Sequence, residues 1–154
     1  MKLHYVVFLL LGMFVHGCFS IGSTTLPTPS EGFVPQKSYT TSFEHVWTAV
    51  DNVLRNERIA TTKHDKENKQ ITTEYIQGSQ SVQIVSVINS RYKYVISFST
   101  PSPTQTDIYI VAHIETSSKN MDWHEVSQDN PEIIEGLEYW LYEKIESELN
   151  KEGE

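Results

Sequence analysis

The sequence is poor in cysteine, in arginine and in basic residues as a whole. Its single cysteine, Cys18, excludes any disulfide within the 154-residue chain. Only three arginines are present, and Lys and Arg together number 12 against 20 Asp and Glu. Nucleic-acid binding depends on clustered basic side chains that contact phosphates. This composition therefore argues against a nucleic acid as partner.

The sequence also lacks the short motifs of common catalytic sites. It contains no Gly-x-Ser-x-Gly elbow, no phosphate-binding glycine loop and no His-Glu-x-x-His pattern. A metal site can be imagined only from four residues at loose spacing, namely His113, Asp122, His124 and Glu125. Zinc ligands are usually spaced more tightly, so we interpret these four as solvated surface residues. The sequence predicts a protein that is not an enzyme and that needs neither a metal nor a cofactor.

The N-terminal residues have the layout of a signal peptide. A short basic start leads into the apolar residues 5–15, a run too short to span a bilayer as a helix. The segment Val15-His16-Gly17-Cys18 resembles a bacterial lipobox, which implies that residues 1–17 are removed and that Cys18 carries the lipid. The alternative is a plain secretory signal that is cleaved elsewhere and leaves a free thiol.

Composition divides the remaining chain into a tether, one domain and a short tail. Residues 18–36 are rich in Ser, Thr, Gly and Pro and predict a flexible tether behind the lipidated cysteine. Residues 37–150 are enough for a single domain, and residues 151–154 are expected to be a disordered tail. Phe19 stands where an inner-membrane retention signal would have Asp, which favours the periplasmic face of the outer membrane.

Hydrophobic periodicity predicts a short helix near the start of the domain, after a strand at residues 37–40. Thr41 and Glu44 form a capping-box pattern, with the Thr41 hydroxyl and the glutamate expected to satisfy free amides at the helix start. The apolar residues that follow repeat at helical spacing, and Trp47 among them is expected in the core. The predicted buried face consists of Phe43, Val46, Trp47, Val50, Val53 and Leu54.

Strands and a long second helix are expected after this point. The strands lie at residues 59–63, 70–77, 81–89, 92–99 and 107–116, with turns at 64–69, near 90–91 and at 101–103. Residues 117–130 read as a polar loop. The second helix, at residues 131–149, should bury Ile133, Ile134, Leu137, Trp140, Leu141, Ile145 and Leu149. The fold class is α+β, with an antiparallel meander sheet packed on a long C-terminal helix and one shorter N-terminal helix, a helix-grip-like arrangement.

Residues 39–50, together with Ile59-Ala60-Thr61-Thr62 and Gln70-Ile71-Thr72-Thr73-Glu74-Tyr75, suggest a family. They are similar to the repeated domain of the lipoprotein C subunit of the outer-membrane β-barrel assembly machine, and to small lipoproteins built on the same domain. The resemblance covers roughly residues 37–150. It implies a lipoprotein that accompanies envelope assembly.

The candidate binding residues lie in the loop before the second helix. Trp123, flanked by Met121 and His124, either plugs the end of the core or contacts a partner, because tryptophan is common at binding hot spots. Six tyrosines leave a second question open, because they can either fill an ordinary core or line a cavity for an apolar ligand. The six concerned are Tyr75, Tyr92, Tyr94, Tyr109, Tyr139 and Tyr142.

These observations support two hypotheses about function. The first is a membrane-anchored bacterial lipoprotein that binds another protein of the cell envelope, with Cys18 as anchor and the loop around Trp123 as contact. The alternative is a periplasmic carrier of a lipid or other apolar ligand. A cavity between the sheet and the helix at 131–149 would favour the carrier, whereas a filled core and an accessible Trp123 would favour the protein binder.

Overall fold

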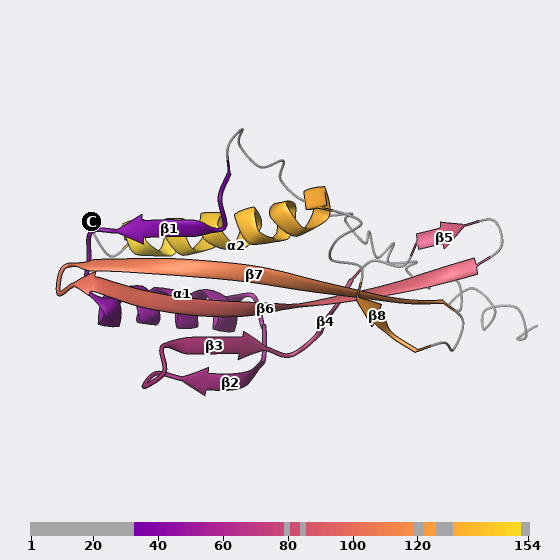
Figure 1. Cartoon of the computed structure of the whole chain (residues 1–154), viewed down its shortest axis with the longest axis horizontal. Helices are drawn as coiled ribbons and strands as arrows, with labels where there is room; N and C mark the ends of the chain where they lie inside the picture. The colour runs from indigo at the N-terminus through magenta and orange to yellow at the C-terminus, as the bar shows by residue number, and fades with distance from the viewer. Residues whose placement is uncertain (1–32, 79–80, 84–85, 119–121, 126–130, 152–154) are drawn as a thin grey trace, which may run out of the picture.

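The computed structural model describes residues 33–78, 81–83, 86–118, 122–125 and 131–151, so Cys18 and Met121 lie outside the described residues. The described strands form one antiparallel sheet, and two helices accompany it (Figure 1). In chain order the elements are β1 (Gln36–Tyr39), α1 (Phe43–Asn56), β2 (Thr61–Asp65), β3 (Gln70–Thr73), β4 (Ile76–Gln77), β5 (Ser81–Gln83), β6 (Ser86–Ser102), β7 (Gln105–Ser118), β8 (His124–Glu125) and α2 (Pro131–Lys151). The predicted α+β class, with the second helix at the C-terminal end, is confirmed.

The long hairpin of β6 and β7 forms the centre of the sheet, and most other strands pair with one of its two strands. The main strand order is β1-β7-β6-β3-β2, while β4 and β5 extend the sheet along β6 and β8 extends it along β7. The register of the hairpin places Ile96 opposite Ile110 and Phe98 opposite Ile108. Because side chains alternate between the two faces of a strand, this register gathers the large apolar residues of both strands on one face.

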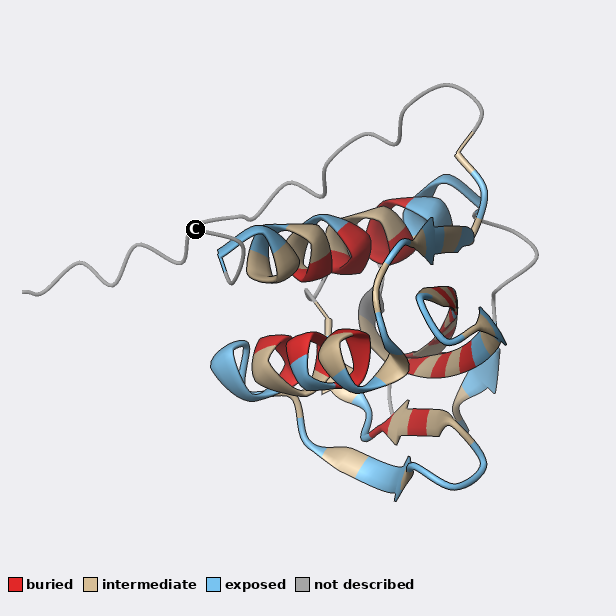
Figure 2. Cartoon of the chain, turned by 90° about the vertical axis from the view of Figure 1, so that its left-hand side faces the viewer, coloured by how far each residue is buried: buried red, intermediate tan, exposed pale blue. Residues whose placement is uncertain are grey.

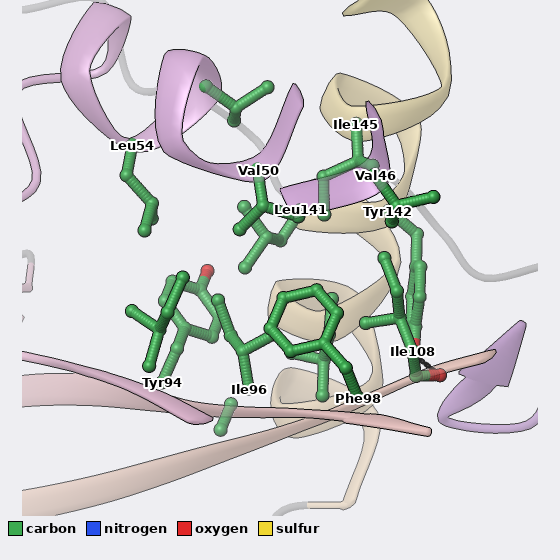
Figure 3. Packing of buried hydrophobic residues seen from close by; sticks show 14 of the residues in the cluster. Val46, Val50, Leu54, Tyr94, Ile96, Phe98, Ile108, Leu141, Tyr142 and Ile145 are labelled. Carbon is green, nitrogen blue, oxygen red and sulfur yellow. Dashed lines mark hydrogen bonds between the residues drawn. The ribbon is translucent and has the colours of Figure 1, made fainter. Parts of the chain in front are cut away.

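Both helices cover that apolar face. In Figure 2 they lie side by side over the sheet, and Figure 3 shows their buried side chains meeting those of the strands. The predicted apolar face of α1 is confirmed, with Trp47 in the core and Phe43 packed against it. From α2, Leu137, Leu141 and Ile145 are buried as expected, whereas Ile133 is 47% exposed. The other predicted residues of this face are partly buried against the core, namely Ile134, Trp140 and Leu149.

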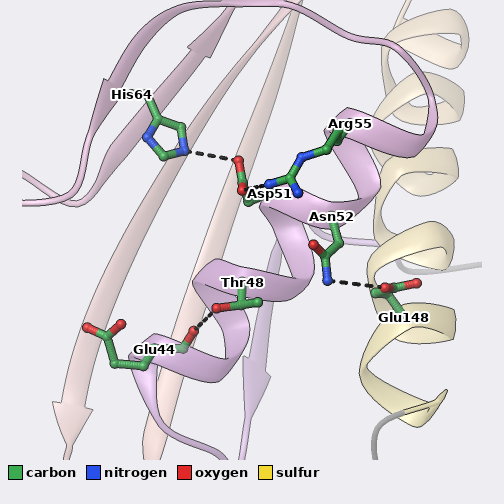
Figure 4. Close-up of polar contacts among 7 residues, drawn as sticks. All are labelled: Glu44, Thr48, Asp51, Asn52, Arg55, His64 and Glu148. Atoms are coloured by element: carbon green, nitrogen blue, oxygen red, sulfur yellow. Dashed lines mark hydrogen bonds and ion pairs between the residues drawn. The ribbon is translucent and has the colours of Figure 1, made fainter.

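Polar contacts join α1 to β2 and to α2 (Figure 4). Asp51 accepts a contact from His64 at 3.2 Å, and Asn52 donates to Glu148 of α2 at 3.4 Å. The turn predicted at residues 64–69 is wrong for His64, which lies in β2 and packs its ring on Trp47. The helix cap is Ser42, whose hydroxyl accepts from the backbone N–H of His45, so the cap lies one residue later than predicted.

The strand boundaries differ from the prediction at several places. The prediction of a turn near residues 90–91 is wrong, because β6 continues through these residues and Arg91 pairs with Glu115 of β7. The break at 101–103 comes later, since β6 passes through Pro101 with a register shift between Ser99 and Ser102. The predicted strand at 70–77 is divided into β3 and β4, which both pair with β6. Residues 117–130, expected to be a loop, contain the short strand β8.

The last residues of the segment expected to be a tether, 33–36, contact the domain. Phe33 makes edge-on ring contacts with Tyr139 and Tyr142 of α2, at centroid separations of 5.6 and 6.0 Å. The carbonyl of Pro35 accepts the backbone N–H of Ile110 in β7 at 3.3 Å. Ring contacts with α2 and a hydrogen bond to β7 therefore hold residues 33–35 against the domain, although their composition is typical of a linker.

A buried carboxylate occupies the edge of β7 between β1 and β8. Glu138 of α2 is 4% exposed, and its Oε1 accepts the backbone N–H of Ala112 at 3.0 Å. β1 pairs with β7 only up to Tyr109, and β8 begins to pair at Glu115, so this N–H has no neighbouring strand in the described sheet. Burial raises the pKa of Glu138, although the hydrogen bond from Ala112 acts in the opposite direction. The glutamate thereby satisfies a strand edge that would otherwise be unpaired.

Replacing Glu138 by Gln should change how stability depends on pH. The folded-state pKa lies above the ordinary value of 4.5, so this group's contribution is greatest below about pH 4.5 and declines as the pH rises through the folded pKa. The amide oxygen of Gln can still accept from Ala112, but it does not titrate. Urea denaturation at several pH values should therefore show Glu138→Gln gaining stability relative to the wild type as pH rises.

Glu138→Leu is the matched comparison. It leaves the Ala112 N–H without its partner and should cost about 1–3 kcal/mol of unfolding free energy. A difference between Glu138→Gln and the wild type that stays constant across pH would contradict the assigned titration.

Candidate functional site

The sheet face opposite the helices is the open face, defined here as Thr72, Lys93, Val95, Ser97, Tyr109, Val111 and His113. These residues alternate with those that point into the core, and no described helix covers them. Val95 lies opposite Val111, and Ser97 lies opposite Tyr109. Tyr109 is 46% exposed, which is unusual for a large aromatic side chain in the centre of a sheet.

One end of the open face holds the Arg91 cluster, which consists of Tyr75, Arg91, Lys93, Glu115 and Trp123. The Arg91 guanidinium lies over two aromatic rings, 4.0 Å from the centroid of Tyr75 and 4.1 Å from that of Trp123. Its Nε and Nη2 donate to Oε2 of Glu115 at 2.8 and 2.6 Å. Tyr75 donates its hydroxyl to Oε1 of the same carboxylate. The Lys93 ammonium lies 4.8 Å from the Tyr75 ring.

Strand pairing brings these residues together. Arg91 and Glu115 are direct partners across β6 and β7, so their side chains emerge on the same face. Tyr75 reaches the cluster because β4 pairs with β6, with Gln77 opposite Arg91. This pairing requires a close approach at Gly78, where a Cβ would lie 2.4 Å from Oγ of Ser90. Glycine at position 78 therefore allows the backbone of β4 to approach β6 closely, which places Tyr75 beside Arg91.

The cluster fixes the charge of Glu115. Partial burial acts to raise its pKa, but the hydrogen bonds from Tyr75 and Arg91, with the charges of Arg91 and Lys93, hold the pKa below its ordinary value. Guanidinium, carboxylate and phenol thus form a satisfied network on the surface. Stacking on two rings adds cation–π attraction and limits the freedom of all three side chains.

The predicted binding residues have different outcomes. Trp123 neither joins the hydrophobic core nor stands alone in a loop, because its ring stacks on Arg91 at the open face. His124 is exposed and begins β8, where it pairs opposite Thr116. Met121 and Cys18 lie outside the described residues. Of the suggested metal ligands, His113 and Glu125 form a pair at 3.0 Å, and the described part of the chain holds no group of three potential ligands.

Sequence reasoning missed Arg91, Tyr75 and Glu115 as members of a site. A turn expected near residues 90–91 separated Arg91 from the strand on which it lies. The alternation of β7, which places Glu115 on the face opposite Ile114, was visible in the sequence. Only the register of the hairpin connects the two residues, and that register is a property of the fold.

The six tyrosines do not line a shared cavity. Tyr94 and Tyr142 are fully buried in the core, where their hydroxyls donate to the carbonyls of Leu137 at 3.2 Å and Ile108 at 3.0 Å. Tyr75 and Tyr109 are exposed on the opposite side of the sheet. Tyr92 packs beside Tyr94, and Tyr139 lies against Phe33.

Comparison with solved structures shows a distant likeness. No protein-family model matches the chain, and no curated protein does. A crystal structure of a DUF4468 family protein from Bacteroides ovatus superposes with a TM-score of 0.36 and 13% sequence identity, over 80% of this chain and 85% of that chain. Agreement at this level carries no argument about function.

Neither helix among the described residues combines the length and the apolar character that crossing a membrane requires.

The network around Glu115 should contribute to stability at neutral pH. Its folded-state pKa lies below the ordinary value of 4.5, so the contribution is present above about pH 4.5 and is lost as the pH falls through the folded pKa. We expect Glu115→Gln to be less stable than the wild type at neutral pH, with a difference that shrinks in acid. Tyr75→Phe removes one hydrogen bond to the carboxylate and should give an intermediate curve. Denaturant unfolding between neutral and acid pH measures both, and a difference that does not shrink in acid would contradict the assignment.

Proposed function

We propose that this protein is a non-enzymatic, membrane-anchored lipoprotein that binds another protein of the bacterial cell envelope through the open face of its sheet. The observation that carries the proposal is the Arg91 cluster, in which Trp123, Arg91 and Tyr75 are stacked on a face that no described helix covers. Tryptophan, tyrosine and arginine are the residues most enriched at interface hot spots. Here their side chains are held in place before any partner arrives, which lowers the entropy lost on binding.

The rest of the open face continues the surface. Glu115 and Tyr109 lie six residues apart on β7, so the face extends for about 20 Å from the Arg91 cluster to Tyr109. Val95 and Val111 lie between them and are half-buried, with His113 and Lys93 beside the cluster. Aromatic residues and arginine are enriched in protein interfaces, and an apolar centre with a polar rim is their usual arrangement.

The competing hypothesis of an apolar carrier finds less support. Tyr94, Leu141, Tyr142 and Ile145 are fully buried between the sheet and the helices (Figure 3), which leaves them no contact with solvent. Trp123 is half-buried, but it stacks on Arg91 at the open face and not in the core, which supports the protein binder. The same face suits an accessory to envelope assembly, which is the role that the resemblance to the lipoprotein C subunit implies.

Membrane attachment through Cys18 gives a first test of this proposal. Cys18→Ala removes the proposed lipid attachment site and should move the protein from the membrane fraction to the soluble fraction of fractionated cells. Serine at the same position serves as the conservative control and should behave like alanine. Persistence of either variant in washed membranes, with no protein partner recovered beside it, would contradict lipid anchoring.

The open face can be tested by photocrosslinking in intact cells. A photoreactive phenylalanine analogue replaces Tyr109 on the open face or Ile133 on α2, two residues of nearly equal exposure at 46% and 47%. We expect a specific protein adduct from position 109 and none from position 133. Arg91→Ala should reduce the yield from position 109, because it releases Trp123 and Tyr75 from their stack.

The outcomes separate the hypotheses. Recovery of β-barrel assembly subunits in the adduct would support the role implied by the resemblance. Equal adducts from both positions, or no adduct from Tyr109, would contradict the proposed surface.

A further inference from the structure

A cleft of about 450 Å³ lies at the turn end of the β6–β7 hairpin. It is lined by Phe43, Lys69, Thr100, Pro101, Ser102 and Pro103. Thr100 and Arg91 are nine residues apart on β6, so the cleft lies about 30 Å from the Arg91 cluster. Its volume falls within the range of about 300–1,000 Å³ that small-molecule sites occupy.

The apolar walls of the cleft are formed in advance. The Phe43 ring contacts Trp47 at 5.4 Å and Phe98 at 5.7 Å between centroids, which fixes it against the core. Pro101 and Pro103 form another part of the lining, and the proline ring fixes the backbone torsion φ at each position. The cleft therefore offers a rigid apolar surface rather than one that must be assembled on binding.

The cleft also contains a cation that pairs with none of the described carboxylates. The Lys69 ammonium donates to Oγ1 of Thr100 at 2.5 Å and lies 5.5 Å from the centroid of Phe43. It forms no ion pair with a carboxylate of the described residues, although acidic residues outnumber basic ones in this chain. Most other described basic side chains do form such pairs, namely Lys37, Arg55, Lys63, Lys66, Arg91, Lys144 and Lys151.

Neighbouring charges leave the Lys69 ammonium available. Glu44 follows Phe43 in α1, but its carboxylate pairs with Lys66. Thr100 is a neutral acceptor and occupies one of the three N–H donors of the ammonium. The hydroxyls of Thr100 and Ser102 add further hydrogen-bonding groups at the same place. One positive charge with neutral hydroxyls matches a monoanion better than a phosphate dianion, for which an arginine fork or several cations are usual.

We propose that this cleft binds a carboxylate carried on a small apolar or aromatic body. Lys69 pairs with the carboxylate, and Phe43 with the two prolines packs against the body. The ligand is either a free organic acid or the C-terminal carboxylate of a peptide that ends in an apolar residue. Both present the same chemistry to the cleft.

A matched pair of probes tests this site in the full chain, purified in detergent micelles. Amide chemical shifts are followed by nuclear magnetic resonance during titration with 3-phenylpropionate or with its neutral amide, and micelles alone correct for partitioning. We expect saturable shifts at Phe43, Lys69 and Ser102 with the carboxylate, and about tenfold weaker binding of the amide, because a charge-assisted hydrogen bond is lost.

Variants at two lysines isolate the charge. Lys69 has φ of 52°, a left-handed conformation that asparagine also adopts, so Lys69→Asn removes the ammonium without opposing the backbone. It should bind the carboxylate about tenfold more weakly, while Lys63→Asn, on β2 and outside the cleft lining, should bind as the wild type does. Equal affinity for the two probes, absence of saturation, or unchanged binding by Lys69→Asn would overturn the proposal.

A second titration identifies the source of the carboxylate. A tripeptide ending in phenylalanine with a free C-terminus is compared with 3-phenylpropionate. Tighter binding of the peptide supports a chain terminus as the ligand, and equal or weaker binding supports a small organic acid. If the peptide with an amidated C-terminus binds as tightly as the free acid, recognition of the carboxylate is excluded.

Discussion

The register of the β6–β7 hairpin is the constraint on which the rest of the structure depends. It places Tyr94, Ile96 and Phe98 on the same face as the isoleucines of β7, and that face binds both helices. A shift of one residue would turn every one of these side chains to the other face. The same register fixes the open face, because Val111, Tyr109 and Glu115 can only lie on the side that the core does not use. Core and candidate surface are therefore two consequences of one pairing.

The polar groups of the core show how the helices are held on this sheet. The hydroxyls of Tyr94 and Tyr142 donate to backbone carbonyls across the helix–sheet interface, and Glu138 accepts the Ala112 N–H at the edge of β7. Each of these groups would cost free energy if it were buried without a partner. Their bonds select one placement of α2 over the sheet, whereas apolar packing alone would allow several. The burial of these side chains between helix and sheet is one reason for proposing that binding occurs at the surface of the protein and not in its interior.

Prediction from the sequence succeeded where a single period decides the structure. Alternation in residues 107–116 and helical spacing from Val46 to Leu54 correctly indicated which side chains are buried. It failed where a long-range contact overrides a local signal. The polar Ser90-Arg91 pair is typical of a turn, but pairing with β7 keeps it in a strand. The composition around Phe33 is typical of a linker, but the Phe33 ring contacts Tyr139 and Tyr142 of α2. Trp123 was identified as a candidate contact without its stack, because Arg91 comes from a segment 32 residues away.

The sequence by itself determined the class of the fold, the buried faces of its main elements and the order in which they follow, since these depend on propensity and periodicity within short windows. It also supplied the pattern from which a lipid anchor at Cys18 is proposed. The tertiary structure decided which residues meet. The Arg91 cluster joins residues from β6, β7 and the segments before β4 and β8, and the Lys69 cleft joins a turn, a helix start and a hairpin end. Such sites depend on strand register and on helix placement, which arise from packing across the whole core and have no signature within any one segment.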